Sequence, residues 1–533
     1  MKKIIALVLA MCLLLAAVPG FALELLSGAD TYPMNATDKT ITWYAQDGII
    51  PHEKFVDWTE SPFHTNLSKQ VGLNIDWMFP TTGSDGGTFT NALMADPSNL
   101  PNIMSIYCAS SATEYMDDGL IWDLTPYIQE YAPAYYAFLQ ANPAYDKAMK
   151  DDQGRYYAFG FFREDGGWND TYQGPVIRTD WLAECGLEMP KTISEFENVM
   201  RVFNEKYGAV FTGAWERFQY MNMCGAFGAY GGAYMSYSIV DGKVILAQTT
   251  DGYRAYVSWM NKMWEEGLID QDLFSMDDSM VKTKVLNNKV GIGYSSMGQI
   301  TSWNKSLEAE GKEPVWVGLA FPTADDGSLS AIFGGYGIDS RTTVITKSTD
   351  EETMKLCLRA LDYAYTQEGF MYWNYGIEGD TWTTDENGVT VYTEKVTNDT
   401  DSEPLEKYVG TTRGAPSIQA TNMLYQKNST VAIEANNTWY YVYPDDAEKN
   451  LAVTAGWKWP NGTTYTYDES EELAMIGTGV YPYVSESYAA FVVGTKDIDD
   501  DAVWTEYLAK LEDLNLTRIL EIKQDTYDRY LAR

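Results

Sequence analysis

Residues 41–79 contain Ile41-Thr42-Trp43-Tyr44, then a stretch from His64 to Val71 that suits a helix, then Asn74-Ile75-Asp76-Trp77-Met78-Phe79. The first and last runs are short and rich in β-branched and aromatic residues, a composition that predicts strands. A strand, a helix and a second strand in this order indicate an α/β fold.

A third apolar run, Ile103 to Tyr107, continues this pattern and ends in Cys108-Ala109-Ser110-Ser111. In open α/β sheets, ligands bind beyond the carboxyl ends of the strands. The loop 108–111 is therefore expected to face a ligand crevice. Pro175 to Arg178 predicts a further strand.

Helices are predicted where apolar residues recur on one face and a capping residue precedes them. Thr192 and Glu195 form a capping box before the stripe 196–207, and a second stripe covers 253–268. Ser348-Thr349-Asp350-Glu351 is interpreted as another capping box, before a helix that runs through Tyr365. These stripes predict core helices.

The pattern changes between Thr381 and about Thr466 to short Thr/Tyr/Val runs. Glu386-Asn387-Gly388-Val389 and Trp459-Pro460-Asn461-Gly462 predict hairpin turns in this region. Helical periodicity returns from Trp504 to Leu531.

The first 22 residues are typical of a secretory signal peptide. Two lysines follow Met1, residues 4–18 carry no charge, and Gly20 and Ala22 provide small residues for cleavage. The apolar stretch is shorter than the ~20 residues that a membrane span needs. Leu9-Ala10-Met11-Cys12 resembles a lipobox only in part, so simple secretion is favoured over a lipid anchor. The protein is expected to be periplasmic, cell-surface or extracellular.

The charge of the chain excludes several partners. The net charge is −37, and it becomes −39 when Lys2 and Lys3 leave with the signal peptide. Such a chain repels nucleic acid and anionic membranes. Removing 22 of the 533 residues leaves 511, more than one core normally covers, so at least two lobes are expected.

Cysteine and histidine give little material for metal chemistry. Cys108, Cys185, Cys224 and Cys357 remain after cleavage, with no C-x-x-C pair, and their disulfide state stays open. The chain has two histidines. No metal site and no cofactor are expected.

The segment Tyr372-Trp373-Asn374-Tyr375-Gly376-Ile377-Glu378-Gly379-Asp380-Thr381-Trp382 combines aromatic rings, two glycines and two carboxylates. Aromatic faces stack on apolar surfaces, and carboxylates accept hydrogen bonds from hydroxyl groups. This chemistry suits a site that holds a sugar. A buried aromatic turn is the alternative for any single ring.

Four segments, in order, resemble the extracellular solute-binding proteins of ABC importers, the group that includes alginate-oligosaccharide binders. They are Val176–Leu182 with Gly186-Leu187 and Pro190–Thr192; Trp259–Asp270; the Y-G-x-E-G element from Tyr375 to Gly379; and Leu516–Tyr530. Together they extend over most of the chain from about residue 40 onward.

The resemblance implies a type II periplasmic-binding-protein-like fold of two α/β lobes with a ligand cleft between them. After the signal peptide (1–22) and an irregular leader (23–38), it implies lobe one from 39–171 and 332–371, including a crossover. It implies lobe two from 172–331 and 372–533, with C-terminal helices. Tyr294, at the tip of the strand 288–296, is expected to face the cleft.

The resemblance also implies a monomer without enzymatic activity, which captures a carbohydrate by closing its lobes and delivers it to an ABC transporter permease. The candidate ligand-binding residues are Arg163, Glu164, Trp168, Trp215, Tyr230, Tyr294, Tyr336, Tyr375, Glu378, Asp380 and Trp382. Trp43 and Tyr107 are weaker candidates. The segment 204–209 lacks the alternating oxygen ligands of a calcium loop, so no calcium is expected there.

Two other functions remain open. The same two lobes could bind an oligopeptide or another solute. A secreted glycoside hydrolase or lyase would need two carboxylates flanking a sugar, and the 75 acids of this chain make chance pairs unavoidable.

Overall fold

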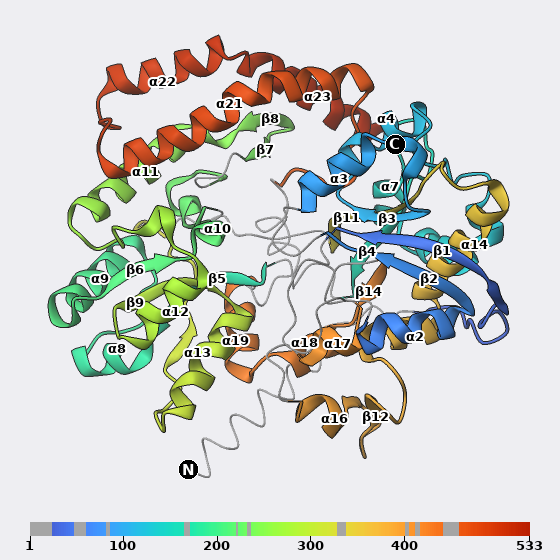
Figure 1. Ribbon diagram of the computed structural model, residues 1–533. Helices are drawn as coiled ribbons and strands as arrows, with labels where there is room; N and C mark the ends of the chain where they lie inside the picture. Colours follow the sequence, from blue (N-terminus) through green and yellow to red (C-terminus); the bar gives the residue numbers. More distant parts are fainter. Residues whose placement is uncertain are drawn as a thin grey trace.

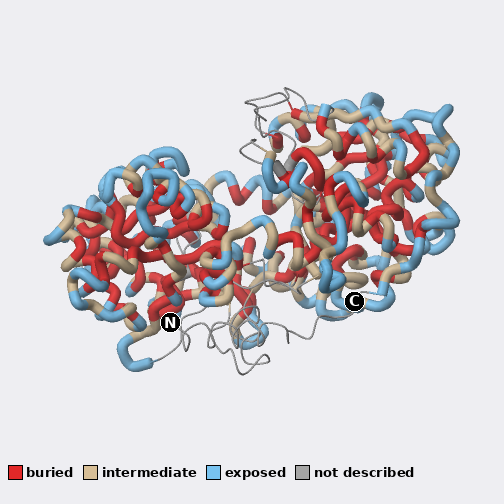
Figure 2. The backbone as a smooth tube through the Cα atoms, turned by 90° about the horizontal axis from the view of Figure 1, so that it is seen from below, coloured by how far each residue is buried: buried red, intermediate tan, exposed pale blue. Residues whose placement is uncertain are grey.

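The computed structural model describes residues 24–46, 60–80, 86–164, 171–219, 222–231, 236–327, 337–399, 404–410, 416–440 and 458–533. Two lobes with buried interiors are joined by a narrower region (Figure 2). The signal peptide predicted at 1–22 lies outside the described residues. In the described part of the chain, no helix is both long enough and apolar enough to span a bilayer.

The helices and strands up to the first crossover are β1 (Ala36–Ala45), α2 (Pro62–Val71), β2 (Leu73–Met78), α3 (Gly86–Met94), β3 (Ile103–Ile106), α4 (Ala112–Asp117), α5 (Ile128–Tyr131), α6 (Pro133–Ala141), α7 (Pro143–Ala148) and β4 (Phe159–Arg163). The strands predicted at 41–44, 74–79 and 103–107 are thereby confirmed, as is the helix between the first two.

The next part of the chain contains β5 (Gln173–Arg178), α8 (Thr179–Cys185), α9 (Ile193–Tyr207), β6 (Val210–Gly213), α10 (Trp215–Phe218), β7 (Tyr237–Val240), β8 (Lys243–Leu246), α11 (Asp251–Glu265), α12 (Asp278–Leu286), β9 (Val290–Ser296), α13 (Met297–Ala309) and β10 (Trp316–Gly318). The predicted capping box is present: Thr192 Oγ1 accepts from Glu195 N, and the Glu195 carboxylate accepts from Thr192 N.

The last part contains β11 (Ile338–Ile345), α14 (Glu351–Asp362), α15 (Gln367–Tyr375), β12 (Trp382–Thr384), β13 (Thr390–Tyr392), α16 (Glu394–Thr397), α17 (Pro404–Tyr408), β14 (Ser417–Gln419), α18 (Thr421–Lys427), α19 (Thr430–Tyr440), α21 (Tyr467–Val493), α22 (Asp501–Asp513) and α23 (Leu516–Ala532). The predicted hairpin turn at 386–389 joins β12 to β13.

Each lobe is built around one mixed sheet. The first sheet has the order β14-β4-β11-β3-β1-β2, and the second has the order β10-β5-β9-β6. β1 pairs in parallel with β2 and β3, whereas β11 runs antiparallel to both of its neighbours. Figure 1 shows α21 and α23 extending above the second sheet toward the first lobe. The two-lobe α/β fold expected from the sequence is confirmed.

Three hydrophobic clusters hold these layers together. The largest joins the second sheet to α9, α11, α13, α19 and the C-terminal helices. A second packs α2, α6, α14 and α15 against the first sheet, and a smaller third cluster lies around β3 and α4. Since each fully buried large side chain contributes about 1.5–3 kcal/mol, these cores account for separate, well-packed lobes.

Two local predictions differ from the structure. The N-cap of α14 is Asp350, which accepts from Thr353 N at 2.7 Å, and not Ser348. Residues 404–410 and 416–440 form mainly helices where short strands were expected, because the Thr- and Asn-containing runs find apolar partners at helical spacing. Residues 461–462 lie in a turn, but 441–457 lie outside the described residues, so the hairpin expected at 459–462 stays a prediction.

The lobe boundaries are also more interleaved than expected. β14 pairs with β4 in the first sheet, and Tyr372 and Trp373 pack in the first-lobe core, although 372–533 was expected in lobe two. The expected irregular leader contacts the rest of the protein from Ser27 onward. Ser27 Oγ and Gly28 N both donate to the Glu368 carboxylate, at 2.7 Å and 2.6 Å.

Candidate functional site

A pocket of about 730 Å³ lies between the first lobe and the C-terminal part of the chain. This volume falls in the range of small-ligand sites, ~300–1,000 Å³. First-lobe lining residues are Tyr107, Ala109, Ser110, Ser111, Met149, Tyr157, Ile338, Asp339, Ser340 and Thr342. The opposite wall consists of residues 459–463, Tyr465, Ser470, Leu473, Ala474, Gly477, Thr478, Tyr481, Pro482 and Lys523.

The loop after β3 supplies part of the first-lobe wall. Tyr107 follows the strand directly and is 50% exposed, although it is a large aromatic residue. Ala109 to Ser111 form one short 3-10 turn that leads into α4. The expectation that 108–111 lies at a ligand crevice agrees with this arrangement, and Tyr107, a weaker sequence candidate, lines the pocket.

Asp339 provides a carboxylate at the start of β11, but this carboxylate already accepts hydrogen bonds from two arginines. Arg341 donates from Nε to Oδ1 at 2.7 Å and from Nη2 to Oδ2 at 2.8 Å, and Arg163 Nη2 lies 3.2 Å from Oδ2. Burial raises the pKa of Asp339, but the Arg341 hydrogen bond and the charges of Arg341 and Arg163 outweigh it, so the pKa is lowered overall. Asp339 is therefore ionised and neutralised in place.

The segment 458–465 is held against the first lobe. Tyr465 N donates to Ser110 O at 3.1 Å, and Asn461 Nδ2 donates to Ile338 O at 2.5 Å. Gly462 has φ +87°, and a Cβ there would lie 2.4 Å from Ala148 O. Only glycine allows this approach, which fixes the opposite wall of the pocket.

Three aromatic rings in the pocket are not fully buried. They are Tyr107, Trp459 and Tyr481, the last of which is 45% exposed on α21. Trp459 is oriented by its Nε1, which donates to Thr463 Oγ1 at 3.0 Å. Partly exposed rings beside hydroxyl and amide groups can stack on a sugar and hydrogen-bond its hydroxyls.

Lys523 brings a single cation to this wall from α23. Its Nζ lies 4.5 Å from the ring centroid of Tyr237, 4.8 Å from that of Trp459 and 5.0 Å from that of Tyr465. It also donates to Tyr465 Oη at 2.5 Å. Burial lowers the pKa of Lys523 to about 8.

Four residues predicted from the sequence come together near the crossovers, outside the lining of the pocket. Arg163 donates to Gln419 Oε1 at 2.7 Å, and the Glu164 carboxylate accepts from Thr421 N at 2.8 Å. Burial raises the pKa of Tyr375 to about 12, an effect opposed by a hydrogen bond with Asn422 and reinforced by the charge of Glu164. The Trp382 ring lies 6.4 Å from that of Tyr375.

The two carboxylates of the 372–382 segment are exposed. Asp380 forms an ion pair with Lys395 at 2.6 Å, and Gly376 ends α15 with φ +84°. Thr381 Oγ1 closes the turn by accepting from Ile377 N at 2.7 Å and donating to Tyr375 O at 2.7 Å. The segment is thus a capped helix end with a surface turn.

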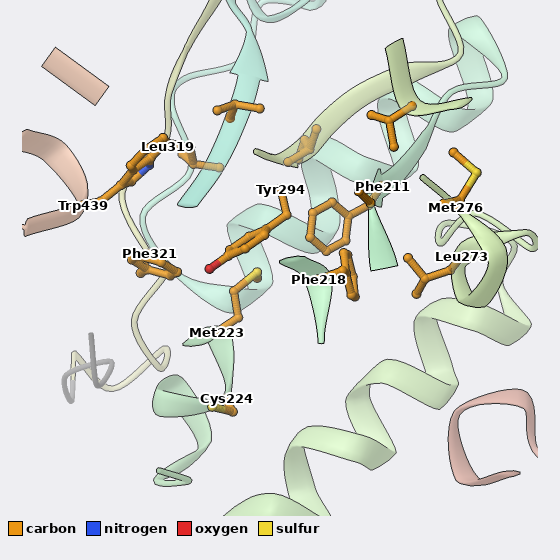
Figure 3. Packing of buried hydrophobic residues seen from close by; sticks show 14 of the residues in the cluster. Phe211, Phe218, Met223, Cys224, Leu273, Met276, Tyr294, Leu319, Phe321 and Trp439 are labelled. Carbon is orange, nitrogen blue, oxygen red and sulfur yellow. The ribbon is translucent and has the colours of Figure 1, made fainter. Parts of the chain in front are cut away.

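The remaining predicted aromatics are dispersed. Tyr294 is 1% exposed, and Figure 3 shows its ring among Phe218, Met223 and Phe321 in the second-lobe core, not facing the cleft as expected. β9 is buried along nearly its whole length, which explains the difference. Trp215 packs against Phe274 at 4.8 Å.

Tyr230 is half-buried, and its carbonyl accepts from Ser238 Oγ at 3.1 Å. Trp168 and Tyr336 lie outside the described residues. Ligand contact by any of the eleven predicted residues stays a prediction, and none of the nine described ones lines the pocket.

Sequence reasoning missed the wall formed by 459–482 and Lys523. One signal was present: Trp459 stands in a polar Trp-Pro-Asn-Gly turn, where a large apolar ring has no local partner. The sequence around Lys523 does not indicate a pocket residue, because its aromatic neighbours come from distant segments.

The described residues contain no group of three or more His, Cys, Asp or Glu side chains arranged to bind a metal ion. The segment examined for a calcium loop is instead the end of α9. Gly208 forms its left-handed cap, and Asn204 Nδ2 donates to Ala209 O at 3.2 Å. Cys108, Cys185, Cys224 and Cys357 are free thiols.

No family model matches the chain. It is 26% identical over 502 residues to the fructooligosaccharide ABC transporter substrate-binding protein FusA of Streptococcus pneumoniae, covering 87% of this chain and 86% of that one. It is 25% identical over 425 residues to the polygalacturonan/rhamnogalacturonan-binding protein YtcQ of Bacillus subtilis, covering 75% of each.

The fold is also found among solved structures. The alginate-binding protein AlgQ2, crystallised without calcium ion, superimposes with a TM-score of 0.71 at 21% identity, over 92% of this chain and 99% of that one. The similarity that four sequence segments indicated is confirmed: the chain has the fold of these proteins and is related in sequence to ABC transporter substrate-binding proteins.

Proposed function

We propose that this chain, as a relative of ABC transporter substrate-binding proteins, is the extracytoplasmic substrate-binding component of an importer and captures a carbohydrate. Sequence similarity extends over most of the chain, to relatives named for binding fructooligosaccharide and polygalacturonan. The observation that carries the proposal is the pocket between the lobes, with its three partly exposed aromatic rings.

Binding there favours a closed arrangement of the lobes, since a ligand that contacts both walls stabilises the state in which they meet. A permease then recognises this state and receives the ligand. Export of the chain, suggested by residues 1–22, is consistent with this role.

The test is calorimetric titration of the protein lacking residues 1–22 with a panel of defined oligosaccharides and peptides. An oligosaccharide that binds and is recovered intact supports the proposal. Binding of peptides alone would support a two-lobe binding protein but contradict a carbohydrate ligand. Recovery of cleaved sugar would favour the hydrolase.

A pair of variants locates the site. Trp459→Ala removes a pocket ring and is expected to weaken binding by at least roughly 2- to 13-fold, because stacking faces contribute ~0.5–1.5 kcal/mol beyond buried area. Trp382→Ala combined with Glu378→Gln alters the 372–382 segment, where the sequence predicts ligand contacts outside the pocket. Unchanged affinity would place the ligand in the pocket alone, and weaker binding would place it at that segment as well. Melting temperatures without ligand control for unfolding.

A further inference from the structure

The charged groups that line the pocket are few. Of the lining residues in the described part of the chain, only Asp339 and Lys523 carry a formal charge at neutral pH. Asp339 is neutralised by Arg341 and Arg163 at hydrogen-bond distance. Neither arginine is among the lining residues, so the cation that a ligand meets in the described lining is the Lys523 ammonium.

Lys523 has no counter-ion in the described part of the chain. No carboxylate there lies within 4.0 Å of its Nζ, and burial is the sole cause that lowers its pKa to about 8. Two other lysines of low exposure are paired, since Lys284 lies 2.7 Å from Asp270 and Lys407 lies 2.7 Å from Asp399. The half-buried Lys147 and Lys282 instead donate to neutral oxygens, Leu531 O and Ser302 Oγ. Lys523 is half-buried, and a partly desolvated cation that lines a pocket without a counter-ion favours a partner supplied by a ligand.

The residues around Lys523 orient its ammonium group but do not accept all of its hydrogen bonds. The faces of Tyr237, Trp459 and Tyr465 attract the ammonium through their ring electrons. The bond to Tyr465 Oη uses one of its three N–H donors, and the described chain supplies no second acceptor. Because Trp459 and Tyr465 also line the pocket, a sugar stacked there comes within reach of the ammonium.

The overall charge of the protein makes this single cation more significant. The net charge of −37 repels anions in general. At physiological ionic strength, however, exposed charges more than ~8 Å away are largely screened, so the nearest group dominates inside a pocket. Lys523 is that group.

We propose that, given the carbohydrate-binding function above, the pocket selects a glycan bearing a carboxylate, such as a uronic-acid oligosaccharide, and that Lys523 is the residue that recognises this carboxylate. Tyr237, Trp459 and Tyr465 position the ammonium, and the pocket rings accept the sugar faces.

The experiment compares uronate trimers (galacturonate, mannuronate and guluronate) with their methyl esters and with neutral maltotriose and kestose, by calorimetry at pH 7. Esterification removes the charge and keeps the sugar skeleton. At least one uronate trimer is expected to bind roughly 10- to 100-fold more tightly than its ester, as for loss of a hydrogen bond to a charged group.

Two variants test the role of Lys523. Lys523→Gln is expected to abolish the preference for acid over ester. Lys312→Gln removes the same unit of charge from an exposed lysine, 2.7 Å from Glu310, and is expected to leave the preference unchanged. If Lys523→Gln fails to fold, the acid and ester comparison on the parent protein still decides whether charge is recognised.

The outcomes separate this inference from the proposed function. Equal binding of uronates, esters and neutral glycans would overturn the acidic ligand and leave carbohydrate capture intact. A preference for acid that survives in Lys523→Gln would overturn the role of Lys523. Absence of binding to every glycan would overturn the proposed function and this inference together.

Discussion

The substitution Asp362→Asn is expected to stabilise the protein at neutral pH and to have little effect on its stability near pH 4. Asp362 ends α14 in the first lobe and is 3% exposed. Burial raises its pKa from 3.8 to about 7, and hydrogen bonds from Tyr135 N, Ala134 N and the Tyr32 hydroxyl reduce this shift without cancelling it. The Tyr135 bond to Oδ1 is 2.7 Å long.

The sign follows from proton binding in the two states. The folded state holds the proton up to about pH 7, whereas the unfolded state releases it near 3.8. The contribution of Asp362 to stability is therefore fully present below pH 3.8 and is lost as the pH rises to 7. A difference of about three pKa units, at ~1.4 kcal/mol each, corresponds to roughly 4 kcal/mol.

The assay is urea unfolding of the parent protein and Asp362→Asn between pH 4 and pH 8. Subtracting the two free energies of unfolding removes every other titrating group. The difference should grow in favour of asparagine by up to about 4 kcal/mol over this range. Asp350→Asn is the control: hydrogen bonds from Thr353 lower the pKa of Asp350 below 3.8, so both folded and unfolded states are ionised over most of this range and the difference should stay nearly flat. A pH-independent difference for Asp362→Asn would refute the reasoning.

Two further predictions concern the pocket and the lobes. Gly462→Ala should destabilise the protein by about 1–3 kcal/mol and weaken ligand binding, because its Cβ would lie 2.4 Å from Ala148 O at φ +87°. Thermal unfolding measures the stability, and calorimetry measures the affinity. Gly327→Ala is the control for backbone strain alone, since Gly327 also has a positive φ but open space around its Cβ position. Small-angle scattering should show a smaller radius of gyration with saturating ligand, and an unchanged radius would contradict lobe closure.

Local features of the fold could be predicted because they depend on neighbouring residues. Thr192 and Glu195 cap α9 as their spacing requires, and strands such as β1 and β2 follow from apolar composition. At α14, Ser348 has the spacing of a capping box, yet Asp350 takes the position. A carboxylate bond to Thr353 N competes with the box, and the sequence alone does not rank the two.

The candidate site was harder to predict because distant segments build it. Tyr294 is in a strand of the expected kind, but the packing of Phe218 and Phe321 around it could not be derived from a single strand. Lys523 appears in the sequence as one position in an amphipathic helix. Its significance depends on Tyr237 and Trp459, which tertiary folding brings to it.

The pocket also has a consequence for biogenesis. Its walls combine Tyr107 with Lys523, so a chain that emerges in N-to-C order has the sequence of most first-lobe strands available long before that of the second wall. Such long-range contacts form late in folding. A chain cut by a protease within α21 would retain every strand of the first sheet but lose Lys523 from its pocket. Because a ligand stabilises only the form that binds it, bound ligand would selectively protect the intact chain from degradation.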